Sequence, residues 1–130
     1  MTALIVKEPW ATMIVTGKKT IELRTRRTTK IGEEIYIAKA GTKTLIGKVT
    51  IQKCSSLTKD EYHLLKDKHK AAGIYANRQI YGWFLSNPVQ FQQPIPYRHP
   101  QGAQMWVKLG HHILCNSKDT ITPNIAPTNS

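Results

Sequence analysis

Three ionisable side chains of both signs lie within six residues near the start of the chain, at Lys19, Glu22 and Arg24. If residues 20–24 form a strand, Glu22 and Arg24 point to the same side, because side chains alternate along a strand. Lys19 precedes the regular alternation and can turn to that side as well. The three charges then either meet at a site for a charged, polar ligand or form a solvated surface network that contributes little free energy.

A converging ammonium, carboxylate and guanidinium would suit two kinds of chemistry. The planar guanidinium of Arg24 can bind a phosphate or the edge of a base. The carboxylate of Glu22 can accept a hydrogen bond from an exocyclic amine or act as a general base. In the second case Lys19 would lower the pKa of Glu22 or serve as its acid–base partner. The residue types alone leave a binding site, a catalytic site and a surface network open.

The elements that must position these residues follow from the hydrophobic pattern. Residues 3–7 are typical of a strand, and Pro9 suits the first turn of a helix over residues 9–16 that ends at Gly17. The apolar face of that helix carries Trp10, Met13 and Ile14, at helical spacing. The alternation over residues 20–24 places Ile21 and Leu23 on the side opposite to Glu22 and Arg24, which predicts a half-buried strand.

Further strands are predicted over residues 34–38, 45–53, 81–86, 89–91 and 103–109. The pair Asn87-Pro88 separates the third and fourth of these. A capping box at Thr58 and Glu61 opens a helix that should run through about Ala72 and stop at Gly73. Five to seven short strands and two helices favour an α+β fold, a small β-barrel flanked by two helices, whose closure removes exposed edges.

The chain should form one domain over residues 1–110. Residues 111–115 are a candidate short strand, and the polar segment that follows, up to residue 130, is expected to be a disordered tail.

The charge balance points to an anionic partner. The chain has 19 Lys and Arg against 8 Asp and Glu, a formal net charge of +11. A surplus of this size favours nucleic acid, although a basic surface with no dedicated partner is the alternative. Two basic segments, 24–30 and 39–53, adjoin the candidate site, so we expect Arg26, Arg27 and Lys39 to contact phosphates.

Three tryptophans could form part of a binding surface. Trp10 shares a helical face with Met13 and Ile14, so the core is its expected place. Trp83 and Phe84 alternate on a strand, so one of them can reach a groove. A Trp83 side chain that lines a basic groove would stack on a base.

Several classes of protein are not supported by the sequence. No apolar stretch has transmembrane length, and the N-terminus lacks a basic leader, so we expect a cytoplasmic protein without a membrane partner. Cys54 and Cys115 lie far apart and are expected to be free thiols. The five histidines show no ligand motif and no glycine-rich phosphate loop is present, so neither a metal nor a cofactor is expected.

Two parts of the chain resemble a known family. Residues 17–24, Gly-Lys-Lys-Thr-Ile-Glu-Leu-Arg, resemble the G-x-K-x-x-E-x-R signature of the ASCH domains, and Pro9-Trp10 precedes them as it does there. Residues 82–88 and 94–97, followed by Gln101-Gly102 and Trp106, resemble the second half of the same domain. The likeness covers about residues 3–109, in the order that the family has.

The resemblance implies a PUA-like fold and an RNA-binding or nucleotide-binding module whose cleft is lined by Lys19, Glu22 and Arg24. Some bacterial members of the family hydrolyse N4-acylated cytidines, and at least one acts as a ribonuclease. The amidohydrolase members have a threonine at the position of Glu22 and a later acidic residue, for which Asp60 and Glu61 are the candidates here.

We therefore expect a binding module. A hydrolase of N4-acetylcytidine-like nucleosides or of RNA, with Lys19 and Glu22 as the acid–base pair, is the alternative. A basic face that docks on an acidic protein is a third interpretation.

Overall fold

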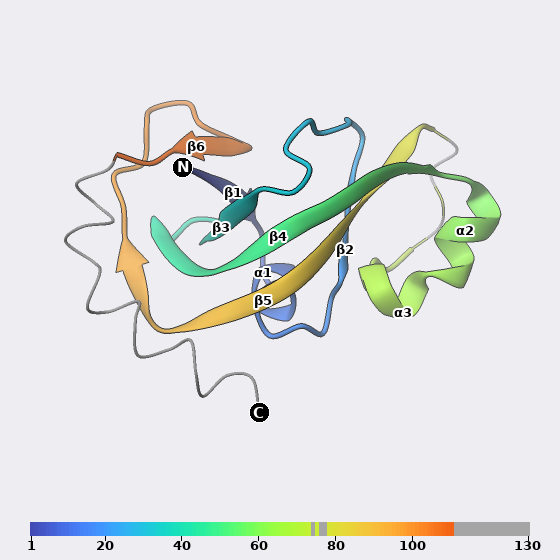
Figure 1. Ribbon diagram of the computed structural model, residues 1–130, viewed down its shortest axis with the longest axis horizontal. Coiled ribbons are helices and arrows are strands. Elements are labelled where there is room, and N and C mark those ends of the chain that lie inside the picture. The colour runs from blue at the N-terminus through green and yellow to red at the C-terminus, as the bar shows by residue number, and fades with distance from the viewer. Residues whose placement is uncertain (74, 76–77, 111–130) are drawn as a thin grey trace.

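A bent, mixed six-stranded sheet carries the fold (Figure 1). The computed structural model describes residues 1–73, 75 and 78–110. The strand order is β2-β5-β4-β3-β1-β6, and β1 and β3 run parallel while the other neighbours are antiparallel. The strands are β1 (Thr2–Val6), β2 (Ile21–Arg24), β3 (Glu34–Lys39), β4 (Thr44–Leu57), β5 (Ile80–Pro96) and β6 (Trp106–Lys108).

The predicted α+β class and strand number agree with this sheet, but closure into a barrel is not confirmed. Within the part of the chain that the structure describes, β2 and β6 form the two edges and do not pair with each other. The candidate strand at residues 111–115 and the expected tail lie outside the described residues. None of the described helices is long and apolar enough to cross a membrane.

The long strands β4 and β5 lie side by side through the middle of the molecule (Figure 1). The predicted break at Asn87-Pro88 is wrong, because β5 continues through both residues. Thr50 pairs with Ser86 and Lys48 pairs with Val89, so two residues of β5 lie opposite one residue of β4. This is the arrangement of a β-bulge, which absorbs the left-handed φ of 53° at Asn87 without ending the strand.

The first helix, α1 (Trp10–Val15), forms where it was predicted and packs on the sheet. It buries Ala11, Ile14 and Val15, and Gly17 follows it with a φ of 83°. The sheet meets this helix at Gly47, where an added Cβ would lie 2.5 Å from Cγ1 of Val15 and 2.2 Å from the carbonyl oxygen of Val89. Only a residue without a side chain fits this contact.

The predicted second helix is divided into α2 (Lys59–Leu64) and α3 (Lys66–His69). The capping box at Thr58 and Glu61 is present. The helix does not reach Ala72, because Nδ1 of His69 accepts the Ala71 N–H at 3.0 Å and Lys70 takes a left-handed φ of 60°. The side chain of His69 therefore replaces a backbone acceptor and ends the helix.

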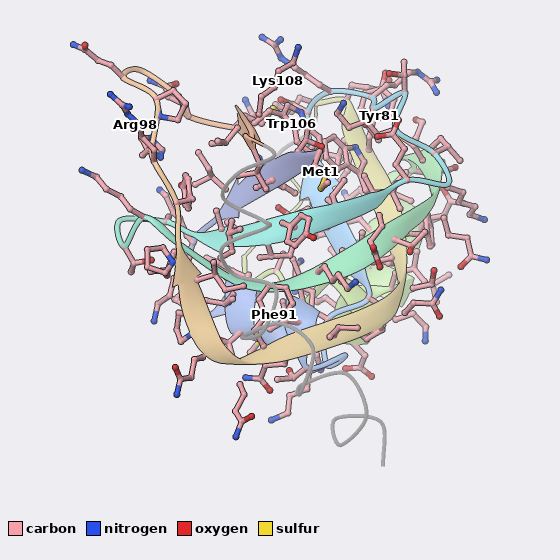
Figure 2. All side chains as sticks on the ribbon, turned by 60° about the vertical axis from the view of Figure 1, so that its left-hand side comes forward. Met1, Tyr81, Phe91, Arg98, Trp106 and Lys108 are labelled. Carbon is pink, nitrogen blue, oxygen red and sulfur yellow. The ribbon has the colours of Figure 1, made fainter. Side chains whose placement is uncertain are left out.

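The core has two parts, one that contains the buried residues of α1 and one formed by strand residues such as Ala38, Leu45 and Phe91. Trp83 is completely buried in the first part and stacks on Trp106 with ring centroids 5.8 Å apart. Phe91 is buried in the second part. Figure 2 shows Arg98 on the loop between β5 and β6, which projects from the sheet and leaves that side chain in solvent.

Candidate functional site

A cavity of about 670 Å³ opens between the end of β1, the start of α1, β2 and the segment that follows α3. Its apolar wall includes Ile5, Leu23, Ile80 and the ring of Trp10. Its polar lining includes Lys19, Glu22 and Arg24 together with Lys7, Arg78 and Gln104. A cavity of this volume, mostly apolar with a few convergent polar groups, is typical of a small-molecule or nucleotide site.

The three residues of the predicted site meet in this cavity. Oε2 of Glu22 accepts a hydrogen bond from Nε of Arg24 at 2.8 Å and lies 2.7 Å from Nη2 of the same side chain. Oε1 of Glu22 lies 3.4 Å from Nζ of Lys19. Strand alternation places Glu22 and Arg24 on the same side of β2, as the sequence predicted, and Lys19 turns to join them. The surface-network alternative is wrong, because only 9% of the Glu22 side chain is exposed.

The ammonium of Lys19 is surrounded by acceptors. Besides Glu22, it donates to the carbonyl oxygens of Ile21, at 2.8 Å, and of His69. Two of the three N–H bonds of the lysine are thus used by backbone carbonyl groups, and the Glu22 carboxylate is the third polar neighbour of Nζ. Burial lowers the pKa of Lys19 from its ordinary value, and the charge of Arg24 acts in the same direction, while Glu22 opposes both. Lys19 therefore holds Glu22 in place, with its ammonium enclosed by these three acceptors.

Arg24 keeps part of its guanidinium available. Its Nη2 also donates to the carbonyl oxygen of Ile5 at 3.2 Å, and its central carbon lies 5.8 Å from the centroid of the Trp83 ring. Among the residues that the structure describes, Nη1 of Arg24 donates no hydrogen bond. The side chain is 20% exposed, so this end of the guanidinium can meet a ligand in the cavity.

Three consecutive carbonyl groups at the end of α3 accept hydrogen bonds from residues of the site. The carbonyl oxygen of Lys68 accepts the N–H of Thr20 at 2.9 Å, and that of His69 accepts Nζ of Lys19. The carbonyl oxygen of Lys70 accepts Nε1 of Trp10 at 3.1 Å. The core position expected for Trp10 is confirmed in part. The side chain packs against the core but is only partly buried, and this hydrogen bond keeps the indole at the cavity wall.

The structure places Trp83 away from the position that its proposed role requires. Its side chain is fully buried, and its Nε1 donates to the carbonyl oxygen of Arg26 at 3.0 Å. Trp83 thus anchors the loop that follows β2 and has no free face for a base. Alternation of Trp83 with Phe84 showed that one of them faces inward, but did not show which.

The remaining predicted contacts lie outside the cavity. Arg26 and Arg27 are exposed on the loop after β2, and the guanidinium carbon of Arg27 lies 4.8 Å from the centroid of the Tyr81 ring. Lys39 lies at the end of β3, where its Nζ is 3.5 Å from a carboxylate oxygen of Glu8. These cations can act on a ligand only beyond the mouth of the cavity or through their electrostatic field.

Lys7 and Arg78 line the cavity and were not identified from the sequence. With Lys19 and Arg24 they make four cationic lining residues against one anionic residue, Glu22, a formal charge of +3. The sequence signal for Lys7 is its place two residues before Pro9, whereas Arg78 carries no signal of its own. Within the described ranges, no group of His, Cys, Asp or Glu side chains could hold a metal ion.

The architecture defined by this sheet and its helices is the PUA-like fold. The family model of the ASCH domain matches residues 4–95, and the chain belongs to the ASCH domain family. No curated protein sequence matches this chain.

Among solved structures, the chain is similar to an ASCH protein from Zymomonas mobilis, at 16% identity with a TM-score of 0.72 over 91% of this chain and 93% of that one. Two point mutants of that protein match equally, covering 94% and 96% of their own chains. At this identity the likeness concerns the fold.

Proposed function

We propose that this chain is a binding module that receives one nucleotide, free or as part of an RNA strand, in the cavity lined by Lys19, Glu22 and Arg24. The observation that carries the proposal is the cavity itself. It has a volume of about 670 Å³, apolar walls, and a buried carboxylate next to a guanidinium with an unused donor end. A base needs this combination of flat apolar contact and a few oriented polar groups.

The polar groups of the cavity complement the edge of a base. Oε1 of Glu22 lies 3.4 Å from Nζ of Lys19, and that oxygen retains a lone pair for an exocyclic or ring N–H. Nη1 of Arg24 can donate to a carbonyl or phosphate oxygen. Trp10, whose orientation the Lys70 carbonyl fixes, supplies the flat wall on which a base would stack. In this proposal Trp10 takes the role that the sequence suggested for Trp83.

The charge around the cavity favours the phosphates of the same ligand. The lining has a formal charge of +3, and the segment from residue 23 to residue 32 contains four cations and no acid. Arg26 and Arg27 extend this positive surface from the mouth of the cavity, so we assign them to phosphate contacts. Lys39 contributes less, because Glu8 neutralises it.

Hydrolysis of an N4-acylated cytidine or of RNA by Lys19 and Glu22 is the alternative, and the contacts of Lys19 make it the weaker one. Nζ of Lys19 donates to two backbone carbonyl groups and lies 3.4 Å from Oε1 of Glu22, so its ammonium is enclosed by acceptors. To act as an acid or base on a substrate, Lys19 would have to give up one of these buried partners. Lowering of its pKa by burial is the single feature that favours proton transfer.

The test is equilibrium binding of the four nucleoside 5′-monophosphates and of a random single-stranded RNA pool, each at several salt concentrations. We expect RNA affinity to fall with salt, with a log–log slope of about −0.7 for each phosphate contact. Arg24→Ala should weaken binding about tenfold or more, because it removes a charge-assisted hydrogen bond inside the cavity. Arg98→Ala is the matched control, since it removes the same charge from the projecting loop (Figure 2).

Two outcomes would contradict the proposal. Equal effects of Arg24→Ala and Arg98→Ala would show that only total charge matters, and that the cavity holds no nucleotide. Release of acetate from N4-acetylcytidine, or cleavage of the RNA pool, by the native chain but not by Lys19→Ala would establish the hydrolase instead.

A further inference from the structure

The three carbonyl groups of residues 68–70 form the feature that the proposed function leaves unexplained. Each accepts a hydrogen bond from a different part of the site, namely the backbone of Thr20, the ammonium of Lys19 and the indole of Trp10. The last carbonyl groups of a helix have no partner within the helix and carry a partial negative charge. The carbonyl groups at the end of α3 and the N–H groups of the site therefore satisfy each other's hydrogen-bonding capacity. The position of the turn at residues 68–70 thus sets the position of the site.

One buried side chain holds the turn in place. His69 is completely buried, its Nε2 lies 2.7 Å from the carbonyl oxygen of Tyr62, and its Nδ1 accepts the Ala71 N–H at 3.0 Å. A nitrogen that faces a carbonyl must donate and a nitrogen that faces an N–H must accept, so the ring is neutral with its proton on Nε2. The ring also stacks on Tyr62, with centroids 4.7 Å apart.

The surroundings of His69 maintain this neutral form. Burial lowers the pKa of His69, and the positive charges of Lys19 and Lys66 and the nearby His63 act in the same direction. The hydrogen bond to the Tyr62 carbonyl opposes them. A protonated ring could no longer accept from Ala71, so the turn depends on an uncharged imidazole.

We propose that His69 is the positioning residue of the nucleotide cavity. It acts through the turn at residues 68–70. The carbonyl groups of this turn orient the Trp10 ring and accept a hydrogen bond from Lys19, and Lys19 in turn holds Glu22. This role rests on the proposed function as far as the ligand is concerned. The positioning itself can be measured in the free protein. His69 touches no ligand in this scheme and has no catalytic role.

The indole N–H groups of Trp10 and Trp83 provide the experiment. In amide and indole hydrogen exchange followed by NMR, Trp10 reports on the bond to Lys70, and Trp83, bonded to Arg26, reports on the core. Trp10→Phe identifies the Trp10 signal. His69→Gln keeps a donor for the Tyr62 carbonyl but loses the acceptor for Ala71, and His69→Asn does the reverse.

We expect indole exchange at Trp10 to accelerate about tenfold or more in both variants, while that at Trp83 changes little. Affinity for the nucleoside monophosphates should fall by about the same factor as in Arg24→Ala. Unchanged exchange at Trp10 in both variants would overturn the proposal. Equal acceleration at Trp10 and Trp83 would overturn it as well, because His69 would then only stabilise the fold.

The readouts separate this proposal from the proposed function. If the native chain binds no nucleotide, the proposed function fails while the exchange at Trp10 still tests the positioning role. If the native chain binds a nucleotide and neither His69 variant changes the affinity, the cavity stands and the positioning role is wrong.

Discussion

The most direct test of the buried charge network is the substitution Glu22→Gln, which removes the negative charge and keeps the size of the side chain. Lys19 is 3% exposed and would remain in place with two carbonyl partners but no counter-charge. Removal of one partner of a buried ion pair costs about 3–5 kcal/mol. Lys19 can instead lose its proton, and from the ordinary pKa of 10.5 this costs about 5 kcal/mol at pH 7. We therefore expect the free energy of unfolding to fall by about 3–5 kcal/mol.

The pH dependence of this loss follows from the same lysine. Without Glu22, the pKa of Lys19 in the folded state falls further below its value in the unfolded chain, since the carboxylate is the main group that raises it. The unfolded state then binds more protons between these two pKa values, so stability rises with pH across that range. The deficit of the variant should shrink as the pH is raised from 7 toward 10.5.

Urea unfolding at neutral and at alkaline pH measures both effects. Glu34→Gln is the matched control, because Glu34 pairs with Lys48 at 3.3 Å but is 50% exposed, and its loss should cost less than about 1 kcal/mol. Adding Lys19→Met to Glu22→Gln should recover part of the stability. A loss no larger than that of Glu34→Gln, or a loss that does not change with pH, would refute the assignment of Lys19 and Glu22 as a buried, interdependent pair.

Three further substitutions test other parts of the structure. Gly47→Ala should destabilise the fold by several kcal/mol in thermal or urea unfolding, since its Cβ would lie 2.2 Å from the carbonyl oxygen of Val89 in β5 and 2.5 Å from Cγ1 of Val15 in α1. Near-native stability would contradict these close approaches. Thr58→Ala should cost about 1 kcal/mol, because the capping box with Glu61 is lost, and no measurable change would show that the cap is not needed. Trp10→Ala should weaken nucleotide binding about tenfold in the equilibrium assay, and unchanged affinity would exclude stacking on that ring.

The charged part of the site could be predicted because it is local in the sequence. Glu22 and Arg24 lie two residues apart on a strand, and alternation alone puts both on one side. Lys19 precedes the alternation, so its direction was left open by the pattern, and the structure turns it toward Glu22. The family resemblance pointed to the same three residues.

The wall of the site could not be predicted because it depends on contacts distant in the sequence. Nothing local to Trp10 shows that its indole will donate to the carbonyl oxygen of Lys70, 60 residues away. Its spacing with Met13 and Ile14 is equally typical of a core residue. Trp83 was misassigned for the same reason, since the burial of an aromatic side chain depends on which face of its strand another segment covers, here the backbone at Arg26.

The two edge strands of the sheet have a consequence for self-association. A long unpaired edge strand can pair with a strand of another chain, and this is a common route to aggregation. Here β2 has four residues and β6 has three. The N–H of Thr20, just before β2, is already bonded to Lys68, and Lys108 places a positive charge on β6. Within the described residues, neither edge strand therefore offers a long row of free backbone groups on which a second molecule could add a strand.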